Sequence, residues 1–289
     1  MLALASLSWS GNHIIARYVG GWAPSWSLNL ARWLVVAALL AIFAWPALKA
    51  DWPTIRENWL ILAFLGATGG GIFGALQYVG LKYTGALNMG VMNSVAPALI
   101  ALASFLIFRD RIGWLQVVGI AISLSGVVAI VSKLDPAVLA NFAFNRGDLI
   151  IVMNMGLWAI YSACLRLRPK MAVTSFLFAL AIASALITLP FAAAEAAHGE
   201  YLKFDAVTFG TITYAAVISS ILAYVCWGRG VETLGVARAG SFLHLVPLFG
   251  ALLATTLLGE RLAIHHFVGF GLILAGVSLA VRPPVGVRR

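Results

Sequence analysis

Aromatic and amide side chains recur at helical spacing inside the long apolar runs of this sequence. Trp9, Asn12 and His13 are spaced i, i+3 and i+4, so they lie on one face of a helix. Side chains of these types bind small molecules, because aromatic rings stack on apolar groups or cations while amides and imidazoles hydrogen-bond polar ends. The pattern recurs in five further runs and predicts a substrate site formed by Trp9, Asn12, His13, Gln77, Tyr78, Asn93, Ser94, Trp158, Tyr161, Ser162, Tyr224, Trp227 and His244.

Prolines in the middle of two runs offer further binding groups. Proline lacks an amide hydrogen, so Pro97 frees the carbonyl group of Asn93 and Pro247 frees that of Leu243. Inside a membrane such groups need a partner, and the ammonium group of a zwitterion is one candidate. An equally good interpretation is that the prolines only kink helices around a cavity.

Glycines have two predicted roles. With the two prolines, four of them are expected to act as hinges: Gly70, Gly74, Gly90, Pro97, Gly240 and Pro247. The run 69–71, with Gly66 and Gly74 at GxxxG spacing, is also typical of close helix packing. Glycines seven residues apart in two later runs predict packing or dimer faces: Gly119, Gly126, Gly269 and Gly276.

The apolar runs also lack several kinds of chemical group. No Asp or Glu lies well inside a run, so a carboxylate proton relay is not expected, and His13 and His244 are the candidate titratable groups. No cluster of buried Arg and Lys is present to bind phosphate. HExxH, GxSxG and Walker motifs are absent, and Cys164 and Cys226 fall inside apolar runs. We therefore expect no enzyme activity, no metal and no cofactor.

The elements that position these residues must be membrane helices. The chain of 289 residues is 62% hydrophobic and 10% charged, with a mean hydropathy of +0.98. The net charge of +9 is attributed to cytoplasmic loops, and no nucleic-acid partner is expected. Each span needs about 20 residues, and the apolar windows predict an all-α polytopic protein with ten transmembrane helices near 2–16, 27–45, 59–81, 87–108, 113–131, 148–165, 172–194, 207–228, 237–258 and 264–281.

The polar stripes fall on the first, third, fourth, sixth, eighth and ninth windows, and the other four are almost wholly aliphatic. We therefore expect a cavity lined by those six helices. Stripes of this kind can also serve only to join helices, but their repetition in both halves favours a cavity. The first helix is read as retained, since it lacks a basic leader and a small-residue cleavage site.

Placing both termini in the cytoplasm puts most Lys and Arg residues on the cytoplasmic side. The two halves of the chain also repeat. Residues 77–131 align without a gap on 227–281, which matches Gly90 with Gly240 and Pro97 with Pro247. The expected organisation is a first five-helix repeat over 1–131, a connecting loop over 132–147 and a second repeat over 148–289.

Five helices are an odd number, so the second repeat must be inverted relative to the first. Inverted repeats are typical of secondary transporters, in which one half rocks against the other around a midplane site. The sequence therefore predicts a transporter.

Specific motifs give the same result. The opening LSWSGNHIIARY and two copies of G-x(4)-G-x(6)-P followed by [DE]-R resemble the EamA-type drug/metabolite transporter superfamily, and more narrowly the YddG-type amino-acid exporters. His13 stands where that family often has phenylalanine. The resemblance covers the whole chain and implies ten helices, cytoplasmic termini, a bacterial inner membrane and export of amino acids or related metabolites.

We therefore expect an alternating-access exporter of neutral and aromatic amino acids, with these substrates and the lipid bilayer as partners, working as a monomer or weak homodimer. Efflux of lipophilic cations is the alternative, although Asn12 and His13 occupy the region where small multidrug transporters carry a glutamate. A non-transporting membrane receptor or scaffold is a second alternative.

Overall fold

The computed structural model describes residues 1–19, 23–83, 92–141, 145–203, 205–258 and 263–282. Within these ranges the chain is helical and contains no β-strand. Seven helices there are long and apolar enough to cross a membrane, namely Ser25–Phe43, Trp59–Tyr83, Trp114–Ser132, Arg146–Leu167, Val173–Ala197, Ala206–Leu234 and Val236–Leu253. Two shorter helices, Ala96–Phe108 and Ile264–Ala280, are also apolar. The fold is that of a polytopic helical membrane protein.

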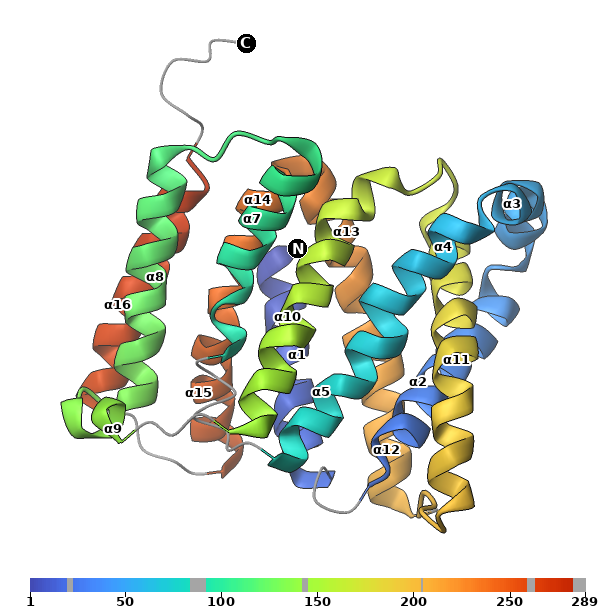
Figure 1. The fold of residues 1–289 in the computed structure, drawn as a ribbon, viewed down its shortest axis with the longest axis horizontal. Coiled ribbons are helices and arrows are strands. Elements are labelled where there is room, and N and C mark those ends of the chain that lie inside the picture. The colour runs from blue at the N-terminus through green and yellow to red at the C-terminus, as the bar shows by residue number, and fades with distance from the viewer. Residues whose placement is uncertain (20–22, 84–91, 142–144, 204, 259–262, 283–289) are drawn as a thin grey trace.

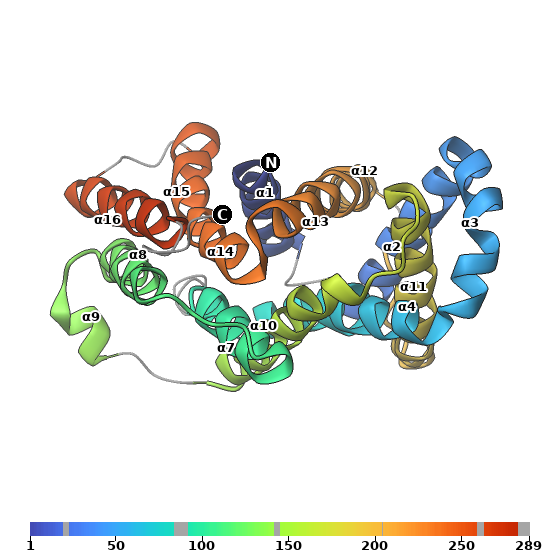
Figure 2. The same cartoon turned by 90° about the horizontal axis from the view of Figure 1, so that it is seen from above.

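The helices run roughly along one direction (Figure 1). Figure 2 shows α8 beside α16 at one side of the molecule and α2 beside α11 at the other, with the remaining long helices between them. The elements are α1 (Leu2–Val19), α2 (Ser25–Phe43), α3 (Trp45–Glu57), α4 (Trp59–Gly66), α5 (Ile72–Tyr83), α7 (Ala96–Phe108), α8 (Trp114–Ser132), α9 (Pro136–Ala140), α10 (Arg146–Cys164), α11 (Val173–Ala197), α12 (Ala206–Tyr214), α13 (Ala223–Leu234), α14 (Val236–Ser241), α15 (Leu245–Leu258) and α16 (Ile264–Ala280).

One end of the bundle, uppermost in Figure 1, is where α7, α10 and α13 end and α4 begins. We call it the basic end, because Arg56, Arg109, Arg166, Arg168 and Arg282 lie there. The other end, where α2 and α10 begin, is called the far end.

Helix α3 lies outside the predicted apolar windows. Its sequence mixes Lys49, Asp51 and Arg56 with tryptophans, so it has no continuous apolar run. Tertiary contacts hold it in place: Leu48 is buried, and the carboxylate of Asp51 accepts a hydrogen bond of 2.9 Å from the backbone N–H of Ala172. The hydropathy pattern could not show these contacts.

Helices α8 and α16 pack backbone against backbone through the glycines expected to form packing or dimer faces. A Cβ atom on Gly119 would lie 2.6 Å from the carbonyl oxygen of Gly276, and one on Gly126 would lie 2.7 Å from that of Gly269. Such distances leave no room for a side chain. These glycine faces therefore meet each other within the chain.

A partly buried carboxylate joins the opposite pair, α2 and α11. Glu195 of α11 accepts hydrogen bonds from the backbone N–H groups of Trp26 (3.1 Å) and Ser27 (2.8 Å) at the start of α2. These N–H groups lack partners within the helix, and a negative charge there also interacts favourably with the helix dipole. This cap holds the first turn of α2 at the far end.

Candidate binding cavity

A cavity lies between the central helices, and the space in it that the centre of a water-sized sphere can reach is about 70 Å³. The residues that line it come from the six predicted windows and also from α2. Those that the sequence singled out for binding are Trp9, Asn12, His13, Gln77, Tyr78, Asn93, Trp158 and Tyr224. Their role in binding stays a prediction.

Other lining residues carry no signal in the polar stripes. Phe73, Met155 and Leu243 give the cavity apolar walls, and Ser219 contributes a hydroxyl group. The unexpected member is Arg32 of α2, a helix that we predicted not to line the cavity. That prediction was wrong because Arg32 lies near the start of an otherwise aliphatic window. A charge at such a position is expected to lie at the membrane surface and not in a cavity.

A chain of polar groups crosses the cavity wall between α1, α5 and α10. Gln77 Nε2 lies 3.3 Å from His13 Nε2, and Gln77 Oε1 accepts a hydrogen bond of 2.9 Å from the amide of Asn154. Asn12 also lines the cavity, and its side chain makes no hydrogen bond within the described part of the chain. Its amide is therefore available to a ligand.

Two π-helical segments lie beside the cavity, Ala67–Gly71 between α4 and α5 and Ala215–Leu222 between α12 and α13. Their wider turns leave carbonyl groups that accept bonds from other elements. The indole N–H of Trp33 donates to Gly70 O (3.0 Å), and that of Trp9 donates to Ser219 O (3.1 Å). The two segments thereby orient tryptophan rings around the site.

An aromatic cluster lies on the side of the cavity that faces the basic end. Ring centroids of Trp9 and Trp158 are 5.1 Å apart, and those of Trp158 and Tyr161 are also 5.1 Å apart. Trp227 lies 5.6 Å from Trp9, and Tyr224 donates to the carbonyl oxygen of Gly69. Tyr161 and Trp227 do not line the cavity but support the rings that do.

His244 does not line the cavity. It is fully buried, and its ring nitrogens contact the hydroxyl oxygen of Ser123 and, at 2.9 Å, the carbonyl oxygen of Ser94. Ser94 and Ser162 are likewise buried outside the cavity lining. For Ser94 and His244 the physical reason is local geometry: the chain forms a turn at 94–95 and a 3₁₀ segment at Phe242–His244, so the helical phase changes before each proline.

The kink at Pro247 gains hydrogen bonds from α1. Ser6 donates to the carbonyl oxygen of Phe242 (2.8 Å), and Ser10 donates to that of Val246 (2.7 Å). Carbonyl groups in this kinked region thus find partners within the protein, as a membrane environment demands. The alternative that the prolines kink helices around the cavity fits this arrangement.

The predicted hinge glycines lie in tight contacts. A Cβ atom on Gly70 would lie 2.6 Å from the Trp33 ring, and one on Gly240 would lie 3.3 Å from Ile100. Gly74 faces the amide of Asn29 and also lines the cavity. Gly90 lies outside the described residues. Close approach alone explains why these positions are glycine, and their hinge role stays a prediction.

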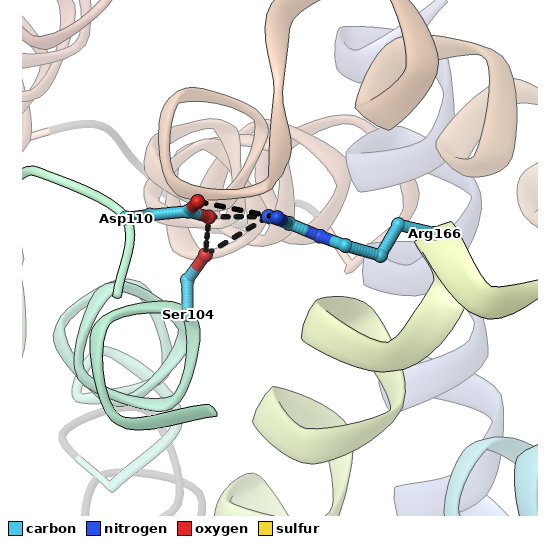
Figure 3. Close-up of polar contacts among 3 residues, drawn as sticks. All are labelled: Ser104, Asp110 and Arg166. Atoms are coloured by element: carbon cyan, nitrogen blue, oxygen red, sulfur yellow. Dashed lines mark hydrogen bonds and ion pairs between the residues drawn. The ribbon is translucent and has the colours of Figure 1, made fainter. Parts of the chain in front are cut away.

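Polar contacts at the basic end join α10 to neighbouring elements (Figure 3). The guanidinium group of Arg166 pairs with the carboxylate of Asp110, which also accepts a hydrogen bond from Ser104. The hydrogen bond from Arg166 lowers the pKa of Asp110. Arg168 pairs with Glu232 of α13 at 2.6 Å. We did not predict these pairs, although the Asp110-Arg111 motif marks their position.

Several buried polar atoms on the cavity wall lack partners within the described residues. They are Tyr78 Oη, Asn93 Oδ1, Trp158 Nε1 and Ser219 Oγ. Unpaired buried polar groups are costly, so they mark places where a ligand or water can bind. No group of three His, Cys, Asp or Glu side chains suited to a metal occurs in the part of the chain that the structure describes.

Comparison with known proteins gives a consistent result. The sequence profile of the EamA-like transporter family matches residues 1–132 and 145–282. The "Uncharacterized transporter YyaM" of Bacillus subtilis (strain 168) is 25% identical over 92% of this chain and 87% of its own. The "Probable terminal-alkyne amino-acid exporter" of Streptantibioticus cattleyicolor is 29% identical over 91% of this chain and 86% of its own. A solved crystal structure has the same fold, with a TM-score of 0.77 at 19% identity over 96% of this chain and 94% of its own.

Proposed function

Because the chain belongs to the EamA-like transporter family and is therefore a membrane transporter, we propose that it exports neutral and aromatic amino acids and related metabolites. The substrate crosses the membrane through the central cavity by alternating access. The relative named as an amino-acid exporter supports this choice of substrate. The family and the relatives described above are transporters rather than enzymes.

The observation that carries the proposal is a cavity that residues of both halves line, with the aromatic cluster on its basic-end side. Residues of α1, α5 and α7 line it together with residues of α10, α13 and α15. The aromatic cluster and the Asp110–Arg166 and Arg168–Glu232 pairs lie between the cavity and the basic end. The polar residues that line the cavity therefore lie between the aromatic cluster and the far end of the bundle.

We further propose ten spans arranged as two inverted repeats, 1–131 and 148–289, joined by 132–147. The π-helical segments support this, because Ala67–Gly71 shifted by 150 residues falls within Ala215–Leu222. The basic end then faces the cytoplasm of a bacterial inner membrane, and both termini lie on that side. A monomer is the proposed unit, since the glycine faces of α8 and α16 are used within the chain.

Efflux of lipophilic cations is the second candidate, and the aromatic cluster favours it. Trp9, Trp158 and Tyr224 have ring faces of the kind that attract organic cations. A flux assay with both substrate classes separates the two proposals.

Counterflow in proteoliposomes tests the proposal directly. Vesicles with purified protein are loaded with unlabelled phenylalanine, and uptake of radiolabelled phenylalanine, methionine, threonine or glutamate is measured without a proton gradient. Protein-free vesicles give the background. Exchange of several neutral amino acids is the expected result. Transport of tetraphenylphosphonium without amino-acid exchange would favour the second candidate, and no flux of either would contradict both.

A further inference from the structure

Arg32 is a buried cation in the wall of the cavity. Its side chain is 5% exposed. It lies seven residues, or about 10 Å, after Ser25, where α2 begins at the far end of the bundle. Its Nε donates a hydrogen bond of 2.6 Å to the hydroxyl oxygen of Ser220. Its guanidinium carbon lies 5.1 Å from the centroid of the Trp33 ring. These contacts fix the plane of the guanidinium group.

The two terminal nitrogens of the Arg32 guanidinium group have no partner within the described residues. Neither terminal nitrogen of Arg32 makes a hydrogen bond there, and the ion pairs found in those residues are Asp110–Arg166 and Arg168–Glu232. The carboxylate of Glu195, on the helix α11 that packs against α2, is used to cap the start of α2. A buried charge without a counterion is strongly unfavourable. An anionic ligand in the cavity would supply the counterion that the described residues lack.

The chemistry of the rest of the cavity defines that anion. The described lining residues include no second cation besides Arg32 and no carboxylate, so the site suits a single negative charge better than a phosphate dianion. Two terminal nitrogens in one plane match the two oxygens of a carboxylate. Asn93 Oδ1 is an unpaired acceptor on the same cavity wall and suits an ammonium group.

We propose that Arg32 binds the carboxylate of the transported molecule and makes the cavity select carboxylates over lipophilic cations. This rests on the proposed function and names the chemical group that the site recognises. Ser220 is a positioning residue, because its hydroxyl group binds Nε and donates in turn to the carbonyl oxygen of Ala215 at 2.7 Å. The π-helical segment Ala215–Leu222 thus holds the arginine in place.

Binding of matched probes tests this without depending on flux. Quenching of tryptophan fluorescence in purified protein is titrated with phenylalanine, 3-phenylpropionate, which lacks the ammonium group, and phenethylamine, which lacks the carboxylate. The wild-type protein should bind 3-phenylpropionate about 10- to 100-fold more tightly than phenethylamine, the range for a charge-assisted pair. Arg32→Gln should remove this preference by weakening 3-phenylpropionate binding while phenethylamine binding stays the same or tightens.

Two variants separate recognition from folding. Arg229→Gln makes the same change on an exposed face of α13 and should leave the preference unchanged. Arg32→Lys keeps the charge but not the paired nitrogens, so it should retain a reduced preference for 3-phenylpropionate. If Arg32→Gln fails to fold, as judged by its thermal transition, Arg32→Lys and Ser220→Ala take its place. The quantity compared with wild type is the ratio of the Kd for phenethylamine to the Kd for 3-phenylpropionate, which should be smaller in both variants.

The outcomes distinguish this inference from the proposed function. A wild-type protein that binds phenethylamine as tightly as 3-phenylpropionate would overturn the role of Arg32, even when counterflow shows amino-acid exchange. Equal ratios in wild type and Arg32→Gln would overturn it as well. An Arg32-dependent carboxylate preference without amino-acid flux would uphold the inference and contradict the proposed substrate.

Discussion

His244 Nε2 lies 2.9 Å from the carbonyl oxygen of Ser94, and this contact joins the kinked segments that precede Pro97 and Pro247. The other ring nitrogen contacts Ser123 of α8. Three elements far apart in sequence therefore meet on one imidazole ring. His244 is placed to stabilise the fold and is not among the residues that line the cavity.

His244→Ala should lower the free energy of unfolding by about 1 to 3 kcal/mol, because buried polar groups of Ser94 and Ser123 lose their partner. The folded fraction should keep its substrate KM. Thermal unfolding in detergent and counterflow on the same preparation measure both effects. His198→Ala, which removes an exposed histidine, serves as the control. A raised KM with unchanged stability would return His244 to the binding site.

Asn12→Ala should weaken substrate binding and leave stability nearly unchanged. Asn12 lines the cavity, and its side chain makes no hydrogen bond within the described residues, so its replacement breaks no side-chain hydrogen bond there. Loss of one hydrogen bond to substrate corresponds to about a two- to tenfold rise in KM. Counterflow measures this, with the exposed Asn141→Ala as the matched control. An unchanged KM would remove Asn12 from the site.

Gly126→Val should destabilise the protein by about 1 to 3 kcal/mol or more, through overpacking against α16. Its Cβ atom would already lie 2.7 Å from the carbonyl oxygen of Gly269 and 2.8 Å from the backbone nitrogen of Ile273. The midpoint of thermal unfolding gives the effect. Gly271→Val on α16 is the matched control, because its Cβ atom meets nothing within 4 Å. Equal midpoints for the two variants would contradict the backbone contact.

Asp110→Asn should loosen the basic end by breaking the pair with Arg166. Cys164, which is free and buried near the end of α10, should then react faster with a maleimide, by up to about fivefold because the pair is partly exposed. A Cys164→Ser variant gives the background from Cys226. No increase in rate would show that Asp110 does not help to close this end.

The same pair predicts a pH dependence. Arg166 lowers the pKa of Asp110 below its ordinary value, so the folded state favours the ionised carboxylate. The contribution of the pair is fully present above the ordinary pKa of aspartate and is lost as the pH falls through the lowered value. A maleimide reacts with the thiolate, whose fraction falls with pH in both proteins, so the readout is the ratio of the Cys164 rate in Asp110→Asn to that in wild type at the same pH. This ratio should stay constant near neutral pH and fall toward one only in strong acid, where the wild-type protein loses the pair as well.

Eight of the sixteen residues that line the cavity were among the predicted binding residues. Asn12, His13 and Gln77 are among them because they lie on unbroken helix, where spacing alone fixes which residues share a face. Ser94 and His244 lie outside the cavity lining because the chain departs from α-helical phase before each proline, and their role in binding stays a prediction. The register of the backbone there depends on tertiary bonds such as Ser6 to Phe242.

Arg32 and the π-helical segments were missed for different reasons. Arg32 is a single charge in an aliphatic window, and hydropathy cannot tell a charge that faces lipid headgroups from one that faces a cavity. The wide turns at 67–71 are stabilised by contacts of Gly70 with Asn29 and Trp33 of another helix, and no local pattern encodes them.

The glycine contact between α8 and α16 limits how the molecule can change shape. Helix α8 lies in the first region matched by the family profile and α16 in the second, and the same holds for α2 and α11. Each flanking pair thus ties one half of the sequence to the other. In the alternating access that we propose, halves joined at both sides would not separate as two rigid bodies; each moving body would contain helices from both halves, or the central helices would bend. The proposed repeats and the proposed moving bodies are then different divisions of the same chain.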